Sequence, residues 1–170
     1  MGLGVGFFFL KYRMLQAAGY YNMGAFWKNG VAGIGYFAGG IDSGNSSDID
    51  GIVFATEAAK NPAATLSVAR YYPTGVNSAT TAYFAGGYVA ANSSDIDGLT
   101  FATEAATNPA ATLAVARSGP VGVNSTTTGY FAGGVTAGNS SDIDGLTFAT
   151  EAATNPSATL ALARYSLTPA

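Results

Sequence analysis

Three pairs of aspartates, each with one residue between its members, are the side chains of this sequence best placed for chemistry. The pairs are Asp48 and Asp50, Asp95 and Asp97, and Asp142 and Asp144. Two carboxylates are the minimum for acid–base cleavage of a glycosidic bond. Alternating carboxylates followed by a glycine are also typical of calcium loops. The sequence therefore raises two chemical hypotheses, a glycosidase and a calcium site.

The middle aspartate pair lies in a stretch that resembles a calcium loop. Asp95, Asp97, Gly98 and Glu104 fill positions 3, 5, 6 and 12 of such a loop. Position 1 is Ser93, which removes one carboxylate ligand, and the flanking sequence is typical of strands instead of helices. A weak calcium site at these loops stays open as an alternative. The main interpretation is that the aspartates bond turn amides and that the glycine makes a bulge.

Composition argues against catalysis. The chain has no histidine and no cysteine, which excludes histidine general bases, cysteine nucleophiles and zinc–thiolate sites. The aspartate pairs recur without a cluster of cations that would separate the pKa values of the two carboxyls. We therefore expect a protein that is not an enzyme, with no catalytic, cofactor-binding or metal-binding residues and no cofactor beyond the weak calcium alternative.

The aspartate pairs recur because a unit of 47 residues is repeated, so that the chain contains almost three copies of it. Tyr36, Tyr83 and Tyr130 each begin the same segment, Tyr-Phe-Ala-Gly-Gly. Residues 82–117 and 129–164 are identical at 30 of 36 positions. A fixed period of this size indicates a repeat architecture, in which one unit cannot bury its apolar face alone.

The middle unit predicts short strands separated by turns. Residues 82–85 form an aromatic strand that ends in two glycines, and a β-branched stretch precedes it. Residues 95–101 form the next strand, with Leu99 and Phe101 on one face because side chains alternate along a strand. Together with a further strand near the end of the unit, these elements predict a four-stranded antiparallel sheet.

The last segment of the unit admits two interpretations. Residues 112–116 are predicted to be the fourth strand, with Leu113 and Val115 on one face. Asn108 and Pro109 followed by alanines also resemble the start of a helix. The repeat pattern favours the strand.

This order of elements resembles the kelch repeat. The similarity is carried by the aromatic strand ending in Gly86 and Gly87, by the strand at 95–101, and by a final strand that ends in Arg117. Kelch repeats have about 50 residues and form four-stranded propeller blades. The tryptophan of eukaryotic kelch repeats is missing, and Pro109 lies near its place. The resemblance is strongest to the near-identical kelch-like arrays of bacteriophage fibre and appendage proteins, especially those of cyanophages.

The resemblance implies an all-β fold of three blade-like, four-stranded antiparallel repeats. Propellers typically have about four to eight blades, so three repeats would be completed by a homo-oligomer, since exposed sheet edges demand a partner. In such a blade, the arginine that ends each repeat could bond a carbonyl or an acid of the neighbouring blade. The expected divisions are an N-terminal arm at 1–27 and a repeat domain at 28–170, which comprises 28–70, 71–117 and 118–164.

The N-terminal arm differs from the repeats in charge. Residues 1–34 carry three basic residues and no acid, whereas the whole chain has a net charge of −3. The acidic repeats argue against nucleic-acid binding. The apolar stretch at 2–10 is too short to span a bilayer, which needs about 20 residues. We expect an anchoring arm that packs on a partner, with a cleaved signal peptide as the alternative.

The sequence leaves two hypotheses about the function of this protein. The resemblance implies a structural component of a phage virion, such as a tail fibre or another appendage, that attaches to other virion proteins through the arm and could recognise the host. The alternative is a secreted or cell-surface adhesin that binds carbohydrate, because tyrosine rings stack on sugars. Its candidate residues are Tyr36, Tyr83, Tyr88 and Tyr130. The opposing interpretation places these tyrosines between blades, and Phe37, Phe84 and Phe131 in the core.

Overall fold

The structure is a computed structural model that describes residues 25–26, 33–41 and 43–168. These residues form no helix, and their strands group into three four-stranded sheets in which all paired strands are antiparallel. The expectation of an all-β chain built from four-stranded repeats is confirmed at the level of the sheets. The described part of the chain also contains no helix that is long and apolar enough to cross a bilayer.

The strands of each sheet are consecutive in the chain. The first sheet contains β1 (Ala25–Phe26), β2 (Ile34–Ala38), β3 (Ile49–Val53) and β4 (Ala58–Lys60). The second contains β5 (Thr74–Asn77), β6 (Thr81–Ala85), β7 (Ile96–Thr100) and β8 (Ala105–Thr107). The third contains β9 (Val121–Asn124), β10 (Thr128–Ala132), β11 (Ile143–Thr147) and β12 (Ala152–Thr154). Apart from the backbone of β1, the expected arm at 1–27 lies outside the described residues.

Strand register repeats with the sequence. In each sheet the tyrosine of the second strand lies opposite the glycine of the third strand. The pairs are Tyr36–Gly51, Tyr83–Gly98 and Tyr130–Gly145. Because the register is the same in the three sheets, equivalent side chains face equivalent directions.

Two glycines of the repeat are required by the backbone. Gly86 follows β6 with a φ of 69°, a conformation that favours glycine, and a Cβ there would lie 2.7 Å from the carbonyl oxygen of Arg117. A Cβ at Gly98 in β7 would collide with the hydroxyl of Thr107 in β8. The predicted bulge at Gly98 is wrong, because this residue pairs regularly with Tyr83 and Thr107. The glycine instead lets β8 approach β7.

The fourth strand of each sheet lies earlier in the chain than the sequence predicted. In the second sheet this strand is β8, which begins directly after a turn at 101–104. Glu104 closes that turn with a φ of 51°, a conformation that is uncommon for residues other than glycine. The turn contains no glycine or proline, the residues that ordinarily indicate a reversal of the chain in a sequence.

The segment predicted as the fourth strand is an irregular return loop. Within 109–117, Thr112 forms one isolated bridge to Asp95, and the alternative helix does not form. The predicted common face of Leu113 and Val115 is wrong, since their exposed fractions are 3% and 46%. The loop returns along the sheet and places the side chain of Leu113 in the core.

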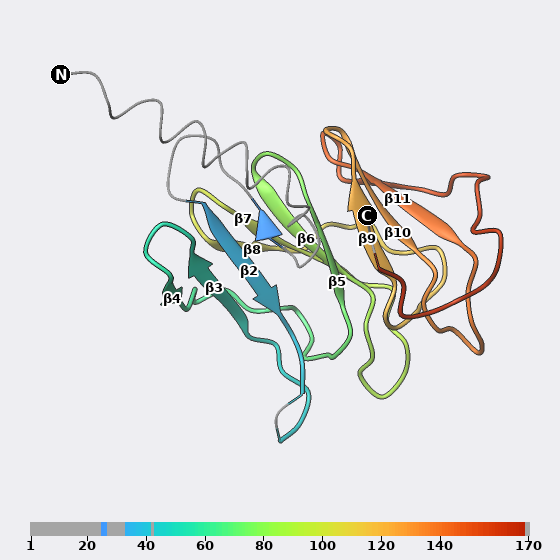
Figure 1. Cartoon of the computed structure of the whole chain (residues 1–170), viewed down its shortest axis with the longest axis horizontal. Coiled ribbons are helices and arrows are strands. Elements are labelled where there is room, and N and C mark those ends of the chain that lie inside the picture. Colours follow the sequence, from blue (N-terminus) through green and yellow to red (C-terminus); the bar gives the residue numbers. More distant parts are fainter. Residues whose placement is uncertain (1–24, 27–32, 42, 169–170) are drawn as a thin grey trace.

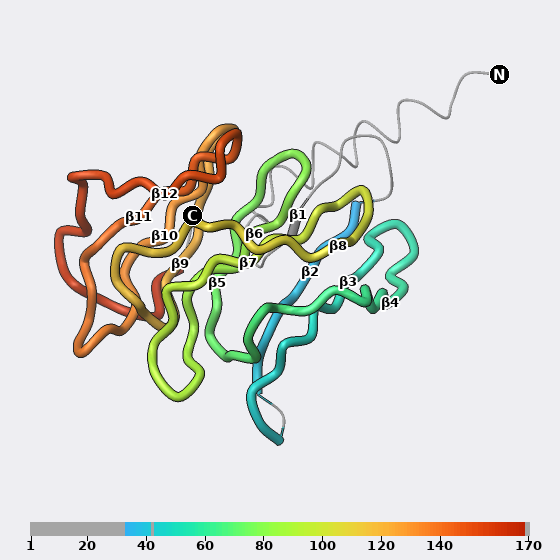
Figure 2. Tube along the Cα trace, turned by 180° about the vertical axis from the view of Figure 1, so that it is seen from behind, coloured from blue at the N-terminus to red at the C-terminus, as the bar shows by residue number. Residues whose placement is uncertain are grey.

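The three sheets follow one another in chain order across the molecule, from β2–β4 through β5–β8 to β9–β12 (Figure 1). The view from behind shows the same order (Figure 2). The second and third sheets meet at their first strands, where β5 lies against β9 and β10. A Cβ at Gly122 in β9 would collide with the carbonyl oxygen of Gly75 in β5. The backbones of these two sheets are therefore closest at that edge.

Candidate functional site

Consecutive repeats are joined by an arginine that ends one repeat and an aspartate in the third strand of the next. Arg70 is fully buried, and its Nη2 lies 2.6 Å from Oδ2 of Asp97. The same nitrogen donates a hydrogen bond to the carbonyl oxygen of Phe84 at 3.1 Å. Because a buried charge is costly unless it is paired, the arginine of the first repeat depends on the second. The expectation that this arginine bonds a carbonyl or an acid of the neighbouring repeat is confirmed, but the arginine ends a loop and not the expected strand.

The junction between the second and third repeats has the same arrangement. Arg117 is fully buried and pairs with Asp144, and its Nη1 donates to Oγ of Ser140 at 3.2 Å. Oδ1 of Asp144 accepts a hydrogen bond from the backbone amide of Ala114 at 3.2 Å. Burial lowers the pKa of Arg117, and the carboxylate of Asp142 partly offsets that effect. The aspartate thus bonds both the side chain and the backbone of the preceding repeat.

A tyrosine of each earlier repeat bonds a glutamate of the next one. The hydroxyl of Tyr36 donates to Glu104 at 2.7 Å, and that of Tyr83 donates to Glu151 at 2.9 Å. Burial, followed by the adjacent carboxylate, raises the pKa of Tyr83 to about 12 and also raises the pKa of Tyr36. Each tyrosine ring is parallel to a phenylalanine ring of the next repeat. These pairs are Tyr36–Phe101 at 6.0 Å and Tyr83–Phe148 at 5.7 Å between ring centroids.

The first junction carries an additional charge. Nζ of Lys60 lies 2.5 Å from Oε1 of Glu104, the oxygen that also accepts the hydrogen bond from Tyr36. Burial alone would raise the pKa of Glu104, but the hydrogen bonds from Lys60 and Tyr36 outweigh it, so this pKa lies below its ordinary value. Thr107 takes the place of Lys60 in the second repeat. The two junctions therefore share the tyrosine–glutamate bond but not the lysine.

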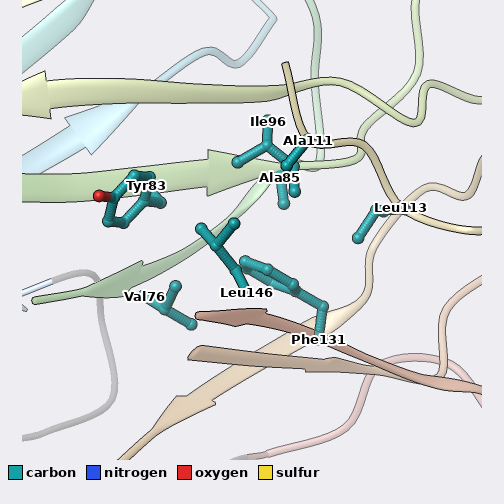
Figure 3. Close-up of a cluster of buried hydrophobic side chains, with 8 residues drawn as sticks. All are labelled: Val76, Tyr83, Ala85, Ile96, Ala111, Leu113, Phe131 and Leu146. Atoms are coloured by element: carbon teal, nitrogen blue, oxygen red, sulfur yellow. The ribbon is translucent and has the colours of Figure 1, made fainter. Parts of the chain in front are cut away.

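Apolar side chains fill the space between sheets. Phe131 and Leu146 of the third sheet point toward the second sheet, and both are fully buried there (Figure 3). They pack against a set of apolar residues from the second repeat: Val76, Tyr83, Ala85, Ile96, Ala111 and Leu113. An equivalent cluster joins the first and second sheets and includes Phe84 and Leu99. The core of this protein is thus located between repeats.

At one end of the array, the third repeat presents the surface that the first two repeats bury. Arg164 is exposed and Tyr130 is half-buried, whereas their counterparts Arg117 and Tyr83 are buried. An apolar groove of about 430 Å³ lies beside them. We call this surface the arginine face, and its residues include Val123, Tyr130, Ile143, Leu160 and Arg164.

At the other end, the first repeat presents the opposite half of a junction. Phe37 is 48% exposed, although Phe84 and Phe131 are buried. Asp50 is exposed, although Asp97 and Asp144 are buried. The interpretation that all three phenylalanines lie in the core is therefore wrong for the first of them. We call this surface the aspartate face, and its residues include Phe37, Asp50, Ile52 and Glu57.

The carboxylates of the calcium-like loop have separate partners. Asp97 pairs with Arg70, and Glu104 bonds Tyr36 and Lys60. Asp95 accepts a hydrogen bond from the hydroxyl of Ser93 at 2.9 Å. In the part of the chain that the structure describes, no three acidic side chains gather as a metal site would require. These partners differ from the turn amides that the main interpretation assigned to the aspartates. Asp95 bonds a serine hydroxyl, and Asp97 bonds an arginine and, at 3.1 Å, the backbone amide of Ser67 in the preceding repeat.

Three of the four candidate sugar-binding tyrosines fall into two groups, and the fourth, Tyr130, lies half-buried on the arginine face. Tyr36 and Tyr83 lie inside the junctions, as the opposing interpretation predicted. Tyr88 instead lies against Tyr71, with ring centroids 5.3 Å apart, and Tyr71 contacts Tyr72 at 4.9 Å. Tyr72 is 66% exposed. The structure therefore gathers three rings at the link between the first and second repeats, two of which the sequence had not singled out.

The hydrogen bonds between tyrosine and glutamate were not predicted from the sequence. Both residues recur with the 47-residue step, which was a usable signal. A constant step does not indicate whether a tyrosine bonds the glutamate of its own repeat or that of the next.

Comparison with known proteins does not identify a family for this chain. No family model matches it, and no curated protein matches it.

Proposed function

We propose that this chain is a non-enzymatic structural component of a phage virion, a tail fibre or another appendage, and that its kelch-like blades are completed by homo-oligomerisation. The observation that supports this role most directly is the repeated junction. Residues whose chemistry could serve catalysis, such as Asp97 and Arg70, bond each other inside it. A chain that uses its charges for cohesion between identical modules is suited to a structural role.

The virion location is tested by analysing purified particles of the virus whose genome encodes the chain. We expect tryptic peptides of the repeats in the particle fraction, and immunogold labelling at one type of appendage. Labelling confined to the host cytoplasm or envelope, with no peptides in the particles, would contradict the proposal.

We further propose that the N-terminal arm attaches the subunit to other virion proteins. Because β1 lies at Ala25–Phe26 and pairs with β2, a clean truncation removes residues 1–24 and leaves the first sheet intact. The truncated chain should keep its sheets by circular dichroism but should no longer be incorporated into particles. Normal incorporation would assign attachment to the repeats instead.

A second candidate function is carbohydrate binding, as in an extracellular or virion adhesin that recognises a host glycan. It is favoured by the ring cluster of Tyr71, Tyr72 and Tyr88, since exposed aromatic rings stack on sugar faces. We expect glycan-array binding that is lost in Tyr72→Ala and retained in Tyr165→Ala, which removes an exposed tyrosine outside the cluster. Equal binding by both variants, or none by the wild type, would exclude this site.

A further inference from the structure

We propose that the arginine face of one copy docks onto the aspartate face of a second copy, so that two chains close into a ring of six sheets. It rests on the proposed homo-oligomerisation and specifies which surfaces of the two copies meet. It is independent of the virion role, because it concerns only the two end faces of the array.

The junctions inside the chain supply the template for this contact. The groove on the arginine face is lined by Val123, Tyr130, Ile143 and Leu160. Their counterparts in the second repeat form one side of the cluster in Figure 3, where Phe131 and Leu146 fill the space between the sheets. The third repeat therefore presents the same apolar lining without the side chains that occupy it elsewhere.

The first repeat carries the side chains that would fill this groove. Phe37 and Ile52 are the residues equivalent to Phe131 and Leu146. Phe37 is about half exposed and Ile52 is only partly buried, although their equivalents are fully buried. Heterologous contacts require two different complementary patches on one chain, and these two faces meet that requirement.

The polar residues of the two faces also match. Arg164 on one face and Asp50 on the other are exposed and carry opposite charges. Their equivalents in the second junction, Arg117 and Asp144, form a buried ion pair. By the same equivalence, Asp50 would accept the amide of Ala161, as Asp97 accepts that of Ser67 at 3.1 Å inside the first junction.

One further hydrogen bond is expected across the contact between copies. Tyr130 is the counterpart of Tyr36 and Tyr83, which donate to glutamates of the following repeat. Glu57 is the counterpart of those glutamates and is exposed in the first repeat. The hydroxyl of Tyr130 would therefore donate to Glu57 of the second copy.

Sheet geometry favours a closed ring over an open filament. The second and third sheets come closest at their first strands, with β5 against β9. Two sheets that are closer at one edge than at the other are inclined to each other. When each further sheet is added with the same inclination, the sheets are arranged around a common axis. Closed propellers typically have about four to eight sheets, and six is the one multiple of three in that range. Two copies of a three-sheet chain would therefore close the ring.

The test is a charge exchange read by light scattering and native mass spectrometry. Wild-type chain should have twice the 17.1 kDa mass of one copy. Arg164→Glu and Asp50→Arg should each dimerise about 100-fold or more weakly, because each breaks a buried ion pair. A 1:1 mixture of the two variants should form a dimer again, since both of its interfaces then join opposite charges. Restoration in the mixture also demonstrates that both variants are folded.

Two controls complete the experiment. Ala106→Glu adds a negative charge to an exposed position of β8 in the middle sheet and should leave the dimer unchanged. The double variant Asp50→Arg with Arg164→Glu should dimerise by itself. A wild type that stays monomeric at high concentration, or single variants that dimerise normally, would overturn the proposal. Masses that keep rising with concentration would overturn the closed ring.

Discussion

Arg117 and Arg164 end almost identical segments, Thr-Leu-Ala-Val-Ala-Arg and Thr-Leu-Ala-Leu-Ala-Arg, yet one is fully buried and the other is exposed. The difference is the repeat that follows Arg117, which supplies Asp144 and the wall of the core. Burial in this protein is therefore decided by the neighbouring repeat and not by local sequence. The comparison between inner junctions and end faces also provides matched pairs of substitutions.

The largest contrast is expected for the arginines. Arg117→Ala should lower the free energy of unfolding by about 3–5 kcal/mol, because Asp144 is left buried without its partner. Arg164→Ala should change it by less than about 0.5 kcal/mol when the chain is dilute enough to be monomeric. Urea unfolding followed by circular dichroism measures both. Similar losses for the two variants would mean that the inner ion pair contributes no more than an exposed charge.

A comparable contrast is expected for the phenylalanines. Phe131→Ala should cost about 3–5 kcal/mol, since it removes a fully buried ring and leaves a cavity. Phe37→Ala should lower the free energy of unfolding of the monomer by less than about 1 kcal/mol, because about half of this residue is already exposed to solvent. Thermal unfolding of the dilute chains gives this comparison. If Phe37→Ala destabilised the monomer as much as Phe131→Ala, the aspartate face would already be covered within a single chain.

A smaller contrast is expected for the tyrosine hydroxyls. Tyr83→Phe should cost about 1–2 kcal/mol, because Glu151 loses a hydrogen-bond donor in a partly buried setting. Tyr130→Phe, the same substitution at the arginine face, should cost less than about 0.5 kcal/mol in the monomer. Urea midpoints at neutral pH measure the difference. Equal costs would show that the bond to the next repeat does not contribute to stability.

The same bonds predict how stability depends on pH. A raised tyrosine pKa means that the stabilisation is complete below about pH 10, the ordinary tyrosine value, and is lost as the pH rises through about 12 for Tyr83. The lowered pKa of Glu104 means that its stabilisation is present at neutral pH and is lost as the pH falls below the ordinary value of 4.5. When tyrosine ionisation is followed by ultraviolet absorbance, the titration curve of Tyr83→Phe should lack the ionisation near pH 12 that the wild type shows. An unchanged curve would contradict the assigned environment.

Much of each sheet was predictable from the sequence, because it depends on local signals. Alternation of side chains located the strands that became β6 and β7, and the glycine pair marked the end of the first of them. The strand β8 was missed because its turn depends on Glu104 in an unusual backbone conformation, with no glycine or proline to mark it.

The junction was predictable only in part. The resemblance to kelch blades implied that the arginine ending each repeat could bond the neighbouring repeat, and Arg70 and Arg117 form such bonds. The identity of the tyrosine–glutamate partners could not be predicted, because every repeat carries both residues at the same positions. The difference between Phe37 and Phe131 was hidden for the same reason, since equivalent residues have the same local sequence but different neighbours.

Arginine labelling tests this account most directly. Phenylglyoxal modification of the dilute monomer, read by peptide mass spectrometry, should modify Arg164 at least tenfold faster than Arg70 and Arg117, because only the latter two are buried in ion pairs. Raising the concentration should then protect Arg164 as a second copy covers it. Equal labelling of the three arginines in the dilute chain would contradict the account.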